Sequence, residues 1–149
     1  MDIRVQQEAF DLGAETEGFA DRQQNMGAIV SFTGVARDLP GVGMDRMEME
    51  HYPGMTERAL GQIAEQALQR WDLGDVLIIH RYGVLYPQDR IMMVATAARH
   101  RVDAFQAAEF LMDYLKSRAP FWKKEITKSG AEWVAAKDDD EDALKRWTR

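Results

Sequence analysis

The spacing of hydrophobic and polar residues changes along the chain, and each change predicts a different element. Ile3 and Val5 alternate with polar residues, which indicates a first strand. The polar stretch 15–24 favours a short surface helix. Residues 27–35 are rich in β-forming side chains and predict a buried strand. Over residues 47–51, methionine and histidine alternate with glutamate, which is the pattern of a half-exposed strand.

Two long segments carry hydrophobic residues at helical spacing. The first, 55–71, starts after Gly54 and stops shortly before Gly74. The second, 102–117, gathers alanine, leucine and methionine on one face, and Pro120 soon follows. Because proline lacks the N–H that a helix needs, the second helix must end before it. We therefore expect two long amphipathic helices.

The remaining hydrophobic segments predict further strands. Residues 75–86 and 90–99 read as two strands joined by a short turn, and residues 121–127 and 132–136 as a hairpin. The run 138–147 begins with acids and ends with bases, which suits a short helix because those charges complement the helix dipole. Strand pairs interrupted by two long helices are typical of an α+β domain with a mostly antiparallel sheet.

Composition narrows the class of protein. The 149 residues fit one domain, 1–149. The chain has no cysteine, which excludes disulfides and thiolate metal sites, and its histidines lack the spacing of metal ligands. Glycine-rich nucleotide-binding loops are also absent. We therefore expect neither a metal nor a cofactor.

The charge and the longest hydrophobic runs bear on partners and location. The net charge is −6, whereas nucleic-acid-binding domains are usually basic. The hydrophobic runs are too short to span a bilayer, and the N-terminal residues form no apolar signal segment. We expect a soluble cytoplasmic protein that binds neither membrane nor nucleic acid.

Positive charge nevertheless gathers late in the chain. The segment from Arg99 to Lys128 holds seven Lys or Arg residues and four Asp or Glu residues, although the whole chain is acidic. Within it, residues 116–125 combine four cations, one proline and two large aromatic residues. A local positive field on an acidic body suggests a small anionic ligand. Chance clustering of solvated lysines is the alternative.

Lys116 and Lys123 flank the constrained turn at Pro120, so both amino groups could reach one pocket. A lysine that is desolvated or set near other cations loses proton affinity and can act as acid, base or nucleophile. The alternative is structural, because Lys116 also suits a helix C-terminus and Lys123 could be a solvated strand residue.

Three further cationic positions suit an anion site. His100 and Arg101 precede a predicted helix, whose free N–H groups and dipole attract negative charge. Arg37 begins a flexible loop after a strand, a frequent place for functional arginines and for ordinary surface ones. His51 and His80 lie within strand patterns, and we interpret both as structural.

Several blocks of the sequence, taken together and in order, resemble the large, catalytic subunit of molybdopterin synthase, the MoaE family. The similarity extends over nearly the whole chain, and the block around Pro120 is the most specific. The blocks are Phe32-Thr33-Gly34-x-x-Arg37, Glu50-His51-Tyr52-Pro53-Gly54-Met55, Ile79-His80-Arg81-Tyr82-Gly83, Arg99-His100-Arg101 and Asp113-Tyr114-Leu115-Lys116-x-x-Ala119-Pro120-Phe121-Trp122-Lys123-Lys124-Glu125.

The resemblance implies a fold, a reaction and partners. The fold would be of the α/β hammerhead type. The reaction would transfer two sulfur atoms to cyclic pyranopterin monophosphate and so form the dithiolene of molybdopterin. The sulfur would arrive as a thiocarboxylate on the C-terminal Gly-Gly of a small ubiquitin-like, MoaD-like subunit. Two large subunits would form a homodimer within a heterotetramer.

The resemblance also implies roles for individual residues. Lys116 and Lys123 would be catalytic lysines that also contact the substrate. The other substrate-binding residues would be Phe32, Arg37, His100, Arg101, Lys124 and Glu125. Lys137 stands where relatives often have arginine; because lysine lacks the bidentate fork of arginine, no role is assigned to it. The leading hypothesis is thus a sulfurtransferase. Its rivals are an anion-binding module without chemistry and an interaction domain that docks a protein tail.

Overall fold

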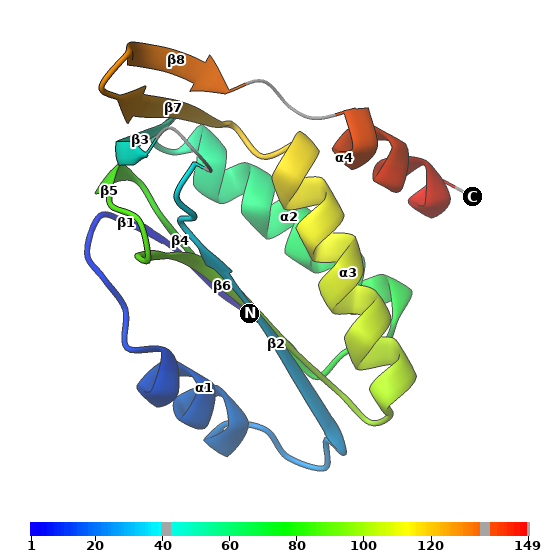
Figure 1. The fold of residues 1–149 in the computed structure, drawn as a ribbon. Coiled ribbons are helices and arrows are strands. Elements are labelled where there is room, and N and C mark those ends of the chain that lie inside the picture. Colours follow the sequence, from blue (N-terminus) through cyan, green and yellow to red (C-terminus); the bar gives the residue numbers. More distant parts are fainter. Residues whose placement is uncertain (40–42, 135–137, 149) are drawn as a thin grey trace.

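A computed structural model describes residues 1–39, 43–134 and 138–148 of the chain. Its strands come in groups that are separated by helices, as the hydrophobic pattern predicts (Figure 1). In chain order they are β1 (Asp2–Gln6), α1 (Leu12–Asp21), β2 (Ala28–Val35), β3 (Met44–His51), α2 (Met55–Arg70), β4 (Asp75–Arg81), β5 (Gly83–Leu85), β6 (Arg90–Ala98), α3 (Arg101–Ser117), β7 (Phe121–Thr127), β8 (Gly130–Val134), α4 (Asp138–Leu144) and a 3-10 turn (Lys145–Trp147).

The strands of the described residues form two four-stranded sheets. The first has the order β1-β4-β6-β2, and the second has the order β5-β3-β7-β8. The pair β1–β4 is parallel, and the other pairs are antiparallel. The α+β class and the mostly antiparallel pairing are therefore confirmed, although the strands divide between two sheets rather than one.

The first sheet has helices on both faces, with α1 on one side and α2 and α3 on the other (Figure 1). Val76 and Ile78 of β4 pack with the core residues of α2 and α3, whereas Leu77 and Ile79 pack against Phe19 of α1. Because side chains alternate along a strand, a strand covered on both faces needs a continuous hydrophobic run. This explains the unbroken apolar run in β4.

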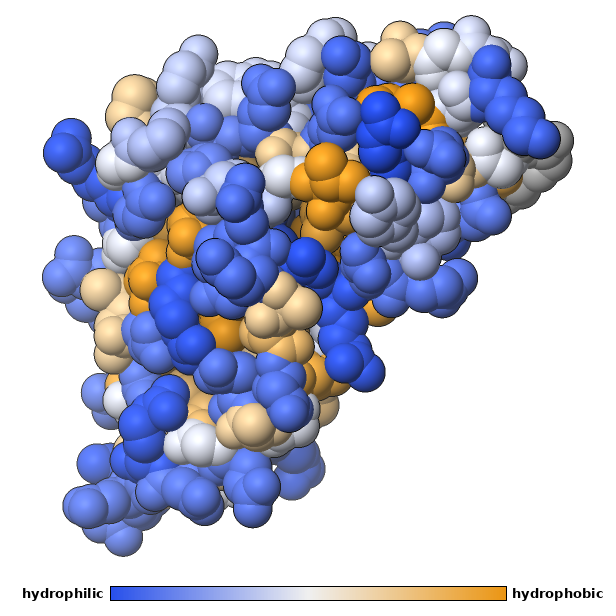
Figure 2. All heavy atoms as spheres, turned by 90° about the vertical axis from the view of Figure 1, so that its left-hand side faces the viewer, coloured by the Kyte–Doolittle hydropathy of each residue, from blue (hydrophilic) through white to orange (hydrophobic). Residues whose placement is uncertain are grey.

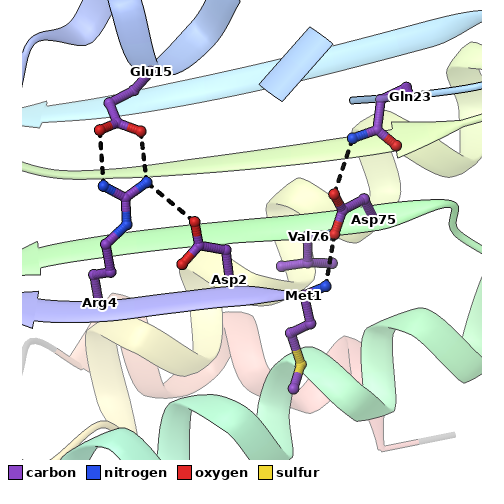
Figure 3. Close-up of polar contacts among 7 residues, drawn as sticks. All are labelled: Met1, Asp2, Arg4, Glu15, Gln23, Asp75 and Val76. Carbon is purple, nitrogen blue, oxygen red and sulfur yellow. Dashed lines mark hydrogen bonds and ion pairs between the residues drawn. The ribbon is translucent and has the colours of Figure 1, made fainter. Parts of the chain in front are cut away.

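The N-terminal segment is fixed to the first sheet by polar contacts (Figure 3). Arg4 of β1 donates a hydrogen bond of 2.8 Å to Glu15 of α1 and one of 3.1 Å to Asp2. The N-terminal ammonium lies 2.8 Å from a carboxylate oxygen of Asp75 at the start of β4. The α1 helix begins at Leu12, three residues before its predicted start, because Asp11 caps it by accepting from the Ala14 N–H.

One predicted strand is divided between the two sheets. The sequence suggests a single strand over 75–86, but β4 ends at Arg81 and β5 begins at Gly83. Gly83 has φ of +89°, a conformation that side chains disfavour, and the chain turns there from one sheet into the other. Leu85 then pairs with Met47 of β3 and joins a separate small core.

The strand predicted over residues 27–35 is present as β2, but the prediction that it is buried is wrong. β2 lies at the edge of the first sheet, where it pairs only with β6 among the described strands. The side chains of Ile29, Phe32 and Val35 are exposed. Strand propensity alone does not distinguish a central strand from an edge strand, because burial depends on what packs against it.

The molecular face in Figure 2 is mainly hydrophilic, with its hydrophobic residues in separate groups.

Candidate functional site

A cavity of about 340 Å³ lies where the end of α3 meets strands of both sheets. Residues of β2, β4 and β6 from the first sheet and of β3, β7 and β8 from the second contribute to its wall. Both Lys116 and Lys123 line it, as does Phe32. Its size is that of a pocket for a small molecule or a short peptide tail.

The turn between α3 and β7 brings the two lysines to this cavity. The helix closes with a 2.7 Å hydrogen bond from the Arg118 N–H to the Tyr114 carbonyl, and Pro120 follows. Strand β7 starts directly afterwards at Phe121 and pairs with β3. The chain thus reverses within a few residues. Lys116 lies on the last turn of α3, and Lys123 is the third residue of β7.

The wall of the cavity combines hydrophobic side chains with cations. Phe32, Met49, Met92 and Phe121 give it an apolar lining. Lys116 is exposed, whereas the side chain of Lys123 is 33% exposed and its Nζ lies 3.9 Å from Glu125. An apolar chamber beside two ammonium groups suits a ligand that joins an uncharged body to an anionic group.

Alternation along β7 separates three of the predicted substrate-binding residues. Lys123 and Glu125 share one face of the strand, and Lys124 lies on the other. The Lys124 ammonium sits 5.3 Å from the centre of the Trp133 ring, a cation–π contact within the β7–β8 hairpin. Glu125 is half-buried beside Lys123 but does not line the cavity, and neither does Lys124.

The predicted anion-binding residues lie elsewhere in the described chain. His100 and Arg101 are exposed at the N-terminal end of α3, about 22 Å along the helix axis from Lys116 at its other end. Arg37 is exposed, two residues beyond Val35, which lines the cavity, but does not line it itself. One chain therefore does not bring His100 and Arg101 to the two lysines. Lys137 lies outside the described residues.

The structure adds His80 to the cavity wall, where the sequence had indicated only a structural histidine. The residue is 7% exposed, and its ring stacks on Phe121 with 3.7 Å between ring centres. Burial is the main cause that lowers the His80 pKa to about 4, and the charge on Lys116 lowers it further. The signals in the sequence were a polar residue after the four apolar residues of β4 and the place of His80 in one of the blocks that resemble the MoaE family.

The described residues contain no cluster of three or more His, Asp or Glu side chains that could hold a metal ion. None of the described helices is long and apolar enough to cross a membrane.

Comparisons with known proteins agree on one family. The model of the MoaE protein family matches residues 5–118. A molybdopterin synthase catalytic subunit from Cereibacter sphaeroides is 65% identical over 99% of this chain and 100% of its own length. The structure of a molybdopterin biosynthesis MoaE protein from Burkholderia ambifaria superposes with a TM-score of 0.84, at 52% identity over 99% of both chains.

A more distant structure shares the fold alone. It belongs to a protein–protein complex of subunits 1 and 2 of molybdopterin-converting factor from Helicobacter pylori, with a TM-score of 0.75 and 17% identity over 91% of this chain and 90% of that one. The family match and the close relatives cover most or nearly all of the chain, from β1 to the C-terminal segment. The chain therefore belongs to the MoaE family, the family of molybdopterin synthase catalytic subunits.

Proposed function

We propose that this chain is the catalytic subunit of a molybdopterin synthase and transfers sulfur to cyclic pyranopterin monophosphate. The observation that carries the proposal is the cavity at the end of α3, in which Lys116 and Lys123 line one apolar chamber. The donor is the thiocarboxylate at the Gly-Gly terminus of a small ubiquitin-like subunit, and the reaction takes place in the cytoplasm. Transfer of two sulfur atoms gives the dithiolene.

In this proposal the two lysines have different tasks. Sulfur leaves the acyl carbon of the tail as a carbon–sulfur bond forms on the pterin. This bond replaces a carbon–oxygen bond of the pterin side chain, whose oxygen leaves. The acyl carbon becomes a carboxylate when water adds to it, or first an amide on the amine of Lys116. The ammonium of Lys123 stabilises the anion that develops during transfer, which is most effective where water is excluded. The half-buried position of Lys123 supports this role.

The partner is a MoaD-like chain whose flexible tail enters the cavity. The Helicobacter pylori structure, a complex of two molybdopterin-converting factor subunits, supports a partner of this kind. The size of the cavity also suits a tail that ends in two glycines, because glycine has no side chain to accommodate.

The substrate phosphate requires further cations, and we propose that a homodimer within a heterotetramer supplies them. His100 and Arg101 lie about 22 Å from Lys116 along α3, too far to hold one small substrate together with it. In a symmetric pair, the same surface of each copy can face the cavity of the other. The second copy would then provide His100 and Arg101. Arg37 would come from the same copy as Lys116 and Lys123.

The central test is reconstitution with purified components. Wild-type chain, thiocarboxylated partner and cyclic pyranopterin monophosphate should form a dithiolene, and Lys116→Ala should reduce the rate by about 100-fold or more. Lys128→Ala is the matched control, because it removes the same charge from an exposed position in the β7–β8 turn. An undiminished rate in Lys116→Ala would refute the role of Lys116, and tail binding without turnover in the wild type would favour an interaction domain.

A further inference from the structure

His80 has an orientation that its neighbours fix. The residue lies in β4, and its Nδ1 is 2.8 Å from the carbonyl oxygen of Arg81. Since a carbonyl oxygen only accepts hydrogen bonds, Nδ1 carries the proton and donates. One face of the ring stacks on Phe121 with an interplanar angle of 16°. With Nδ1 turned to the backbone and one face on Phe121, Nε2 is the polar ring atom that remains for a group in the cavity.

His80 is a neutral acceptor at neutral pH. Burial lowers its pKa, and the proximity of Lys116 and His51 lowers it further, although the hydrogen bond to the Arg81 carbonyl raises it. The other charged side chains on the cavity wall are Lys123 and Asp140. The resulting pKa of about 4 leaves Nε2 unprotonated, with its lone pair available.

The lone pair of Nε2 has no hydrogen-bond donor among the described residues. On the same cavity, the amino group of Lys116 has no hydrogen-bond acceptor or carboxylate partner within the described part of the chain. Lys116 is close enough for its charge to act on His80. The Lys116 amino group, a donor, and His80 Nε2, an acceptor, therefore line one cavity without partners among the described residues. A ligand that expels water from the cavity would favour a hydrogen bond between them.

We propose that His80 is a positioning residue for Lys116, whose amino group donates a hydrogen bond to Nε2 when the tail of the sulfur donor fills the cavity. This bond directs the amine towards the acyl carbon of the tail. Because Nε2 is a weak base, it orients the N–H without removing the proton, and no third positive charge arises beside the two lysines. The inference rests on the proposed sulfur transfer and adds a residue to it.

Two substitutions at position 80 separate hydrogen bonding from packing. His80→Phe keeps an aromatic ring against Phe121 but has no polar atom, whereas His80→Gln places an uncharged amide oxygen near the position of Nε2. We expect kcat for dithiolene formation to fall about 10-fold or more in His80→Phe, with KM for the thiocarboxylated partner little changed. His80→Gln should recover most of the loss. Wild-type kcat in His80→Phe, or a His80→Gln variant no better than His80→Phe, would overturn the proposal.

A spectroscopic measurement tests the contact without a substitution at position 80. The Nε2 resonance of His80 is recorded by nitrogen-15 NMR in the complex with the thiocarboxylated partner, for the wild type and for Lys116→Met. We expect the resonance to move when Lys116 is replaced, because the hydrogen bond is lost. An unchanged resonance, in a preparation whose wild type forms dithiolene, would contradict the role of His80 alone. Failure of the wild type to form dithiolene would instead contradict the proposed function.

Discussion

Some of the side chains on the cavity wall can be predicted from the sequence, whereas others are identified only from the folded structure. The turn at Pro120 made it possible to expect Lys116 and Lys123 in one pocket, and both line the cavity. Their catalytic roles stay predictions. The position of His80 on the cavity wall was not predicted, because a histidine that is packed in the core and one that faces a cavity share the same strand pattern.

The contrast between Lys123 and Lys124 gives a prediction at this scale. The two residues are neighbours with the same charge, but only Lys123 lines the cavity, while Lys124 contacts Trp133 on the opposite face of β7. We therefore expect Lys123→Ala to reduce kcat for dithiolene formation about 100-fold or more and Lys124→Ala to have a much smaller effect. Steady-state kinetics of both variants measures this. Equal losses would mean that the opposite face of β7 also takes part in the reaction.

At the scale of elements, periodicity predicted the long helices and most strands, but not how strands share sheets. α2 and α3 lie within a residue of their predicted bounds, because each buries one face and its end signals are clear. The break between β4 and β5 escaped prediction because hydrophobic residues continue across it and only the backbone of Gly83 marks it. The exposure of β2 depends on its place at the sheet edge, which only the assembled fold determines.

Substitutions at two glycines, one at the turn between the sheets and one in a helix, should have opposite effects on stability. Gly83→Ala places a side chain at φ of +89°, so we expect the free energy of unfolding to fall by about 1–2 kcal/mol. Gly61 lies in α2 with open space around it, and Gly61→Ala should raise the free energy of unfolding by about 0.5–1 kcal/mol. Urea denaturation followed by circular dichroism measures both values. A change of the same sign in the two variants would argue against strain at Gly83.

For the whole molecule, the order of strands and helices predicted the α+β class, and the MoaE resemblance predicted the family. One chain does not reveal how its cationic residues reach a common substrate. His100 and Arg101 occupy one end of α3, and Lys116 occupies the other. The sequence suggested that cationic side chains from separate segments form one anion site. In one chain, the 17-residue helix α3 separates His100 and Arg101 from Lys116.

Mixed dimers test the proposed arrangement. Arg101→Ala and Lys116→Ala should each be nearly inactive alone, because each removes a part of every site. In an equal mixture that exchanges subunits, half of the dimers are mixed, and one of the two sites in each mixed dimer is intact. We expect about one quarter of the wild-type activity to return. If activity stayed at the level of the single variants after confirmed subunit exchange, the two residues would not act in one shared site.

The cavity wall is built from both sheets, and this ties activity to the docking of one sheet on the other. The larger first sheet, covered by helices on both faces, contains most of the buried core, whereas β7 and β8 have mainly half-buried or exposed side chains. Local opening under mild denaturant should begin in such weakly packed strands. Opening of β7 and β8 would move Lys123 out of the cavity, while Lys116 would keep its place on the folded helix α3. Enzyme activity should therefore be lost at a lower denaturant concentration than the helical circular dichroism signal.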